Sequence, residues 1–406
     1  MTVLAESPAR PGEGGPPGGG RRLVEVVLRA RELSILGALV VLVVATTIAN
    51  PRFLSGQGVK DIFLNASILA LLAVGQTMVV VTRNIDLSVG SVVGLVAFCA
   101  GKFASSGDRN VLLVALVGVG IGLACGLVNG LLVSFCRVPA LVVTLGTLYV
   151  IQGLDHYIAH GEQIGAADLP SSVLSLGNDG VLGVPYLPII TVVVMLMIGY
   201  YLRSYSSGRE FYAIGSSPEA ARLAGVSIRR RVLTAYLVSG ALAGLAGVLW
   251  LARFGTVVAD AAHGWELKVV SAVVVGGVAI TGGVGTVYGA ALGALLLTTI
   301  GSVLVVLKVN SFWQDAITGI LLLLAISVDR LLALRVTKAL RQRSLSTGAQ
   351  RRRRGGGRPR NGGPADAGPR DAEDAAGKPA ADKPAAGPSA GASAAEAPKG
   401  KVAHDS

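Results

Sequence analysis

The stretch IFLNASILALLAVGQTMVVVTRNIDLSVGSVVGLVAFCAGKFA, residues 62–104, carries the strongest structural signal in the chain. It holds two apolar runs, each close to the roughly 20 helical residues that the hydrocarbon core of a bilayer requires. Only a short polar segment, residues 82–91, separates the two runs, and it is too short to form a large loop. The stretch therefore predicts an integral membrane protein made of helices, some of them broken or re-entrant.

The composition of the whole chain agrees with a membrane protein. Of 406 residues, 52% are apolar, 15% are charged and 5% are aromatic. The net charge of +12 comes mainly from the two ends and one central loop, whereas a nucleic-acid-binding groove combines basic residues with stacking aromatic ones. We therefore expect no nucleic-acid partner. Cys99, Cys125 and Cys136 have no metal-ligand or redox spacing, so neither a metal nor a cofactor is expected.

Ten runs are long and apolar enough to be candidate transmembrane helices. Six of them are clear: 33–49, 62–82, 111–135, 188–202, 232–251 and 312–328. Glycine and serine interrupt the other four: 85–104, 140–154, 269–282 and 284–307. We therefore predict an all-α membrane protein with about ten transmembrane helices.

The distribution of Lys and Arg predicts which side each loop faces, because short basic loops stay in the cytoplasm. The loop at 203–231 contains six arginines, whereas residues 153–187 contain four acidic residues and no Lys or Arg. The first loop is therefore expected inside and the second outside, with both termini cytoplasmic. Several basic residues fall outside against this trend, namely Arg52, Lys60, Arg109, Arg253, Lys268 and Lys308.

Composition also divides the chain into three parts. Residues 1–31 are predicted to be a disordered basic cytoplasmic segment, and 32–334 to form the transmembrane domain. Residues 335–406 are predicted to be a disordered cytoplasmic tail, because from about Gln342 the chain has almost no large apolar residue to bury. The arginines at 351–354 could contact anionic membrane lipid, or they could only reinforce the orientation.

The polar segment 82–91 allows two interpretations, which are compatible. Asp86 or Ser88 could cap the helix that follows, or the segment could be a discontinuous helix at a solute path. Polar side chains elsewhere in the apolar runs could line the same path or form interhelical hydrogen bonds. The path candidates are Asn65, Gln76, Thr77, Asp86, Ser88, Ser91, Asn129, Thr144, Thr147 and Gln152.

A second informative segment, residues 206–231, lies in the loop expected inside. Pro218 followed by Glu219 is a favourable helix start, and Gly225 is a typical helix end. The segment therefore predicts a short polar helix of about two turns, which is suited to docking a cytoplasmic partner.

Several sequence blocks, in order, resemble the ribose/xylose-type permeases of bacterial ATP-binding cassette importers. The blocks are TRNIDLSVGS (82–91), VNGLL (128–132), VPALVVTLGT (138–147), the EAA-x-x-x-G motif (219–225) and the glycine pairs 276–277 and 282–283. The resemblance covers about residues 32–329. It implies a multi-pass permease in the bacterial plasma membrane that pairs with a second permease copy or paralogue. The other implied partners are two ATP-binding subunits and an extracytoplasmic solute-binding protein.

The resemblance also implies roles for individual residues. The loop 206–231 is similar to the coupling segment that contacts the ATP-binding subunit, and its motif residues here are Glu219, Ala220, Ala221 and Gly225. The blocks TRNID (82–86), WLAR (250–253) and FWQ (312–314) look most like the rhamnose and autoinducer-2 branches. A rhamnose-like monosaccharide is favoured, with autoinducer 2 or another pentose or hexose as the alternative. The usual family form has Gly-Gly at Arg83-Asn84.

Other functional classes have less support. No G-x(4)-G-K-[ST] motif occurs, so ATP hydrolysis is expected on a separate subunit. An ion-coupled secondary transporter stays as an alternative, although such proteins usually place acids within the spans and only Asp86 and Asp315 are marginal cases. His156, His160 and His263 form no recognised catalytic site, so we expect no enzyme and no catalytic residues.

Two sets of residues share one spacing. Thr82, Gly90 and Gly94 repeat as Thr281, Gly289 and Gly293. The match could come from an internal repeat of the kind that transporters carry. Close helix packing alone also produces glycines four residues apart.

Overall fold

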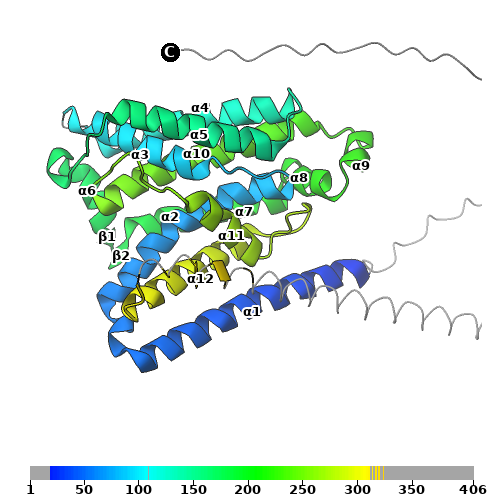
Figure 1. Cartoon of the computed structure of the whole chain (residues 1–406). Helices are drawn as coiled ribbons and strands as arrows, with labels where there is room; N and C mark the ends of the chain where they lie inside the picture. The colour runs from blue at the N-terminus through cyan, green and yellow to red at the C-terminus, as the bar shows by residue number, and fades with distance from the viewer. Residues whose placement is uncertain are drawn as a thin grey trace, which may run out of the picture. The chain divides into compact units, whose positions relative to one another are not determined.

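The computed structural model describes residues 19–107 and 109–310 and six single positions, 313, 316, 317, 319, 320 and 323, with side chains from residue 32 onward. This part of the chain is almost entirely helical (Figure 1). The elements are α1 Gly19–Ala49, η1 Pro51–Leu54, α2 Gly56–Val81, α3 Val89–Ser105, α4 Val111–Ser134, α5 Ala140–Ala159, η2 Ala166–Asp168, α6 Ser171–Asn178, β1 Gly180–Val181, β2 Val184–Pro185, α7 Tyr186–Ser204, α8 Ser206–Ser216, α9 Pro218–Leu223, α10 Ile228–Phe254, α11 Trp265–Val275 and α12 Val287–Val306.

Seven of the described helices are long and apolar enough to cross a membrane: α1, α2, α4, α5, α7, α10 and α12. They match seven of the ten predicted runs. The runs 85–104 and 269–282 instead give α3, with 17 residues, and α11, with 11. Non-helical backbone precedes α3 and follows α11, so each run is only partly helical. The run 312–328 lies almost wholly outside the described residues. The predicted count of about ten transmembrane helices is therefore not confirmed among the described residues, where two of the ten runs form shorter helices.

The helix α2 forms the centre of the bundle. It contacts α10, α12, α7 and α11, and nearly every residue from Ala66 to Val81 is buried. Apolar side chains on all sides suit either a bundle interior or a membrane span, and here the contacts with four other helices place α2 inside.

Glycines bring α4 and α10 into close contact. Gly118, Gly122 and Gly126 of α4 lie against the backbone or side chains of α10, and Gly240 and Gly244 of α10 lie against the backbone of α4, so a Cβ at any of the five would collide. Lipid tails are as apolar as the helices, so close backbone approach, rather than the hydrophobic effect, holds such a pair together.

Three non-helical segments interrupt the bundle. Residues 82–88, here called the first break, join α2 to α3, and residues 276–286, the second break, join α11 to α12. Residues 255–264, the connector, fold back from the end of α10 until they contact the first turns of α3 (Figure 1). Irregular backbone of this kind is tolerated within a membrane protein where other protein surrounds it. These segments fit the expectation of broken or re-entrant helices.

The repeated glycines have different neighbours. Gly90 and Gly94 lie against the connector and the start of α11, whereas Gly289 and Gly293 lie against the end of α11. Close packing explains both pairs, and the internal repeat stays a prediction.

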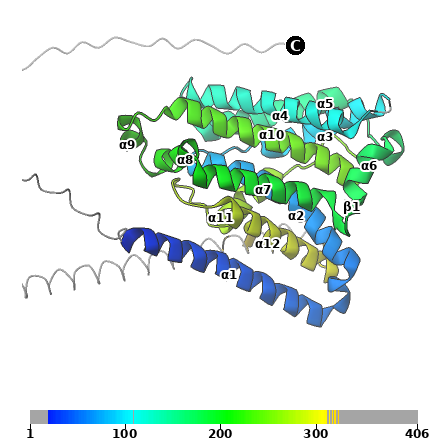
Figure 2. The same ribbon diagram turned by 180° about the vertical axis from the view of Figure 1, so that it is seen from behind.

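The loops expected inside and outside lie at opposite ends of the helices. The short α6 and the β1–β2 hairpin, within residues 160–185, are at one end, and α8 and α9 are at the other (Figure 2). This separation is what the charge pattern requires, while the side each end faces stays a prediction. One correction concerns the N-terminal segment: α1 begins at Gly19, so residues 19–31 are helical. Their sequence GGRRLVEVVLRAR includes good helix formers such as Leu, Arg, Glu and Ala. Residues 1–18 and the predicted tail at 335–406 lie outside the described residues.

Candidate functional site

The first break is built around Asp86. Its carboxylate Oδ1 accepts from the Ser88 N–H at 3.0 Å and from the Ser88 hydroxyl at 2.7 Å, and Oδ2 accepts from the Ser239 hydroxyl of α10 at 3.4 Å. Asp86 therefore holds the turn that leads into α3. Of the two capping residues considered, Ser88 stands at the N-cap position but its hydroxyl accepts no bond from the helix. It faces Asp86 instead, so the capping prediction is wrong for Ser88.

Further polar residues close the same network. With its amide oriented to pair both groups, Gln76 donates to the Asp86 carbonyl at 3.2 Å and accepts from the Asp86 N–H at 3.1 Å. Asn129 donates to the Ser88 hydroxyl at 2.8 Å, and Ser91 donates to the Ser88 carbonyl at 2.8 Å. Thr144 donates to the Ile85 carbonyl at 3.3 Å.

Six predicted path residues, Gln76, Asp86, Ser88, Ser91, Asn129 and Thr144, thus belong to one buried cluster. Buried polar groups require partners, and here most of them bond to one another or to the break. The cluster stabilises irregular backbone inside the bundle, which is the interhelical role considered from sequence.

The other four predicted path residues form different hydrogen bonds or none, and two of them adjoin the cluster at Thr144 and Ser91. Thr77 donates to the Ala73 carbonyl within α2, and Thr147 to the Thr144 carbonyl within α5. Asn65 is half-buried and its Oδ1 has no partner among the described residues. Gln152 faces the connector and bonds to His263 Nδ1 at 3.0 Å.

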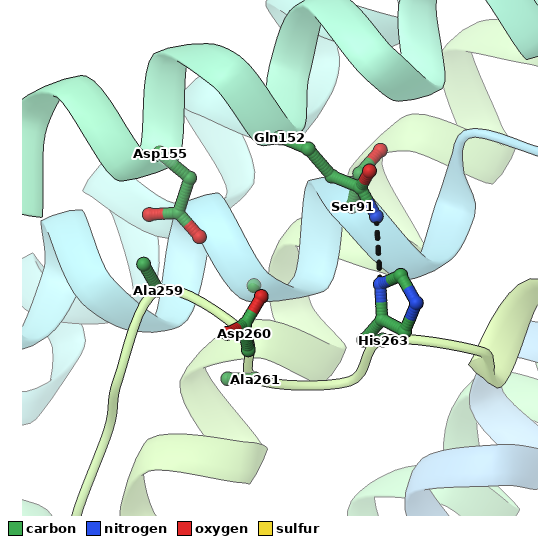
Figure 3. Close-up of a pocket in the computed structure, with 8 residues that line it drawn as sticks. Ser91, Gln152, Asp155, Ala259, Asp260, Ala261 and His263 are labelled. Atoms are coloured by element: carbon green, nitrogen blue, oxygen red, sulfur yellow. Dashed lines mark hydrogen bonds between the residues drawn. The ribbon is translucent and has the colours of Figure 1, made fainter.

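A small pocket lies where α3, α5 and the connector meet (Figure 3). It is lined by Ser91, Gly94, Gln152, Asp155, Ala259, Asp260, Ala261 and His263, and it has room for about one water molecule. At its rim, His156 Nε2 lies 3.3 Å from Asp260 Oδ1. The pocket is closed by side-chain contacts between α5 and the connector.

Two acidic residues near this pocket were missed as path candidates. Asp155 is 2% exposed and its Oδ1 has no partner among the described residues. Glu266, at the start of α11, is half-buried, and its Oε2 also has no partner among the described residues. Both carboxylates lie against the glycine face of α3, Glu266 at Gly90 and Asp155 at Gly94. Helical spacing could have found Asp155, because it shares the buried face of α5 with Thr144, Leu148 and Ile151. Glu266 has no comparable signal.

The segment 206–231 folds as two helices, α8 and α9. Ser217 caps α9 by accepting from the Ala220 N–H at 3.3 Å, and Pro218 occupies its first turn. At the other end, Gly225 has φ +81°, its N–H donates to the Arg222 carbonyl, and the Val226 N–H donates to the Ala221 carbonyl, both at 3.0 Å. This bond pair is the Schellman motif, which glycine favours at its left-handed position.

The surface of α9 is open. Of the four motif residues, Ala221 is buried, whereas Glu219, Ala220 and Gly225 are exposed. Leu223 is 87% exposed, although it is a large apolar side chain. An ion pair joins α8 to the first turn of α10, since Arg231 Nε lies 2.5 Å from Glu210 Oε2.

Comparison with known proteins gives a consistent picture. Residues 58–326 match the family described as branched-chain amino acid transport system / permease component. The chain is 39% identical over 306 residues to the autoinducer 2 import system permease protein LsrC of Enterobacter sp. (strain 638), which covers 75% of this chain and 88% of that protein. It is also 39% identical over 322 residues to the Klebsiella pneumoniae subsp. pneumoniae protein of that name, a match that covers 79% of this chain and 92% of that protein. To the Yersinia pseudotuberculosis serotype O:3 protein it is 35% identical over 320 residues, covering 79% of this chain and 90% of that protein. No solved structure matches.

The family match runs from the first turn of α2 to residue 326. The matches confirm the resemblance found in the sequence blocks, and they confirm that this is a transport subunit of the bacterial inner membrane and no enzyme. The chain belongs to the family of permease components of the branched-chain amino acid transport system type.

Proposed function

We propose that the chain is the permease subunit of an ATP-binding cassette importer for a small hydroxyl-bearing solute, with α9 as its contact to the ATP-binding subunit. The observation that carries the proposal is the open surface of α9, in particular the 87% exposed Leu223. An apolar side chain displayed on a short, rigidly capped helix is suited to insertion into a groove on a partner.

The relatives sharpen the expected solute. The sequence favoured a rhamnose-like sugar and kept autoinducer 2 as the alternative. The relatives described above are autoinducer 2 permeases, at 35% to 39% identity. We therefore propose autoinducer 2 as the first solute to test, ahead of rhamnose.

The solute path requires acceptors that the fold has not already used. Most of the polar cluster at the first break is occupied by internal hydrogen bonds, but Asp155 and Glu266 each keep a buried oxygen without a partner among the described residues. Carboxylates are strong acceptors for hydroxyl groups. We therefore propose the α3 glycine face, with Asp155 and Glu266 beside it, as a part of the path that opens when the connector moves away.

The expected partners follow from the same proposal. They are an ATP-binding subunit at the α8–α9 end, an external solute-binding protein at the α6 end, and a second permease. In this proposal the ATP-binding subunit and the solute-binding protein contact opposite ends of the helices, as coupling of ATP hydrolysis on one side to solute uptake from the other would require.

The test is reconstitution of the chain in proteoliposomes with its genomic neighbours that encode an ATP-binding subunit and a binding protein. ATP-dependent uptake of labelled autoinducer 2 that needs both neighbours would support the proposal. Uptake of rhamnose but not autoinducer 2 would change only the solute.

A second candidate is an ion-coupled secondary transporter, because such proteins use acids inside the bundle, and Asp155 is a buried acid while Glu266 has a buried Oε2. The same vesicles separate the two. Uptake driven by an imposed proton or sodium gradient without ATP would favour the second candidate and contradict the first.

A further inference from the structure

Arg83 occupies an unusual position in the first break. Its φ is +67°, in the left-handed region that glycine adopts without strain and that longer side chains rarely adopt. Its guanidinium leaves the break altogether: Nε donates to the Gly215 carbonyl at 2.6 Å, and Nη2 donates to the Ser216 carbonyl at 2.9 Å. An arginine is therefore unfavourable for the backbone conformation at this position, but its guanidinium forms two hydrogen bonds with carbonyls far along the chain.

The acceptors mark a specific place in the fold. Gly215 and Ser216 are the last two residues of α8, and the next residue, Ser217, caps α9. Carbonyls at a helix C-terminus carry partial negative charge and lack intrahelical partners, so a guanidinium there makes charge-assisted hydrogen bonds. One side chain therefore joins the first break to the point where α9 begins.

The second break meets the same point. The Gly283 N–H donates to the Val81 carbonyl at 2.9 Å, and the Tyr212 hydroxyl of α8 donates to the Gly285 carbonyl at 3.1 Å. Gly215 lies so close to Val81 and Gly283 that a Cβ would collide with both. The end of α8 is thus held between the two breaks without free space, and a displacement of α9 would reach both.

We propose that Arg83 is the positioning residue that transmits movement of α9 to the first break, and through it to Asp86 and the polar cluster. The proposal rests on the proposed function, since it assumes that α9 moves with an ATP-binding subunit. Coupling between distant sites needs a contiguous, packed connection. Arg83 supplies it from only three residues before Asp86.

The experiment compares Arg83→Gly, Arg83→Lys and Arg209→Ala in the reconstituted importer. Glycine suits φ +67° and removes the guanidinium, so the break keeps its backbone while the connection is lost. Lysine keeps the charge with a single donor group. Arg209 is a matched control, because it also bonds helix-end carbonyls, those of Arg203 and Ser204, but it reaches no break.

The measurements are copurification of the ATP-binding subunit, ATPase activity with and without loaded binding protein, and solute transported per ATP. For Arg83→Gly we expect normal copurification, basal ATPase activity within about twofold of the unmodified importer, and at least a tenfold loss of solute per ATP. The solute transported per ATP by Arg83→Lys should lie between the values for Arg83→Gly and the unmodified importer. Arg209→Ala should transport as much solute per ATP as the unmodified importer.

Unchanged solute per ATP in Arg83→Gly would overturn the inference. A second result would also overturn it: both Arg83→Gly and Arg83→Lys lose copurification of the ATP-binding subunit to the same extent as they lose transport. Such a result would mean that Arg83 only stabilises the fold. If the unmodified importer shows no ATP-dependent uptake, the proposed function fails instead, and the two failures are therefore distinct.

Discussion

The first break and α9 are both short polar interruptions between long apolar helices, yet they satisfy their polar groups in different ways. The break is buried, and its backbone depends on side chains from α2, α4, α5 and α10. The helix α9 is exposed and closes its own ends through Ser217 and Gly225. A segment that is complete in itself can present its outer surface to a partner, whereas the break cannot form without the bundle around it.

The largest effect is expected at the end of α9. Gly225→Pro removes the N–H that bonds to the Arg222 carbonyl, and proline cannot adopt φ +81°. The chain should still insert in the membrane, but uptake should fall to background. Gly225→Asn is the control, since asparagine tolerates this backbone. Normal uptake in Gly225→Pro would remove α9 from the mechanism.

The next effect tests the buried side of the comparison. Asp86→Ala leaves the Ser88 N–H, the Ser88 hydroxyl and the Ser239 hydroxyl without their acceptor. Each buried group left unpaired costs about 1–3 kcal/mol of folding stability. We therefore expect the free energy of unfolding to fall by roughly 3 kcal/mol, which should appear as a lower melting temperature in detergent. Asp179→Ala, at an exposed position near the α6 end, should change nothing. An unchanged melting temperature for Asp86→Ala would show that the break does not need its buried network.

A third change separates structural from functional acids. Among the described residues, the buried Oδ1 of Asp155 has no hydrogen-bond partner, so Asp155→Asn should leave the melting temperature equal or higher, unlike Asp86→Ala. A hydrogen bond to a charged group contributes about 1.5–3 kcal/mol, and uptake should therefore fall by about tenfold or more. Asp260→Asn, at the exposed rim of the same pocket, is the comparison. Full uptake in Asp155→Asn would exclude this part of the solute path.

The smallest effect concerns the surface of α9. Leu223→Ala should weaken binding of the ATP-binding subunit by about fivefold, or roughly 1 kcal/mol, as for an ordinary interface residue. The melting temperature should not change, because Leu223 is 87% exposed. Leu182→Ala provides a matched control, since Leu182 is 98% exposed in the hairpin at the other end. Equal affinity in both variants would place the contact elsewhere.

Local signals in the sequence were reliable where one segment supplies its own partners. Seven of the ten predicted apolar runs form long helices in the described part of the chain, because bilayer thickness sets helix length directly. Pro218 and Gly225 predicted the ends of α9, because capping depends on neighbouring residues alone. The grouping of Gln76, Asp86 and Ser91 at one site was partly visible, since all three lie close to the same interruption.

Other features depend on contacts between segments far apart in the chain. The apolar runs 85–104 and 269–282 each include part of a break, because the first break precedes α3 and the second follows α11, and hydropathy does not register this change of backbone. Asp155 looked like part of an acidic outer loop, because its burial is created by α3 and the connector. Composition and local motifs predicted a multi-pass membrane protein with a short polar helix between two spans, and the resemblance of several sequence blocks implied a permease. Only the assembled bundle surrounds Asp86 with hydrogen-bond partners and brings Arg83 to the end of α8. It also buries Asp155 with no partner for its Oδ1 among the described residues, because burial and pairing exist only once the helices are assembled.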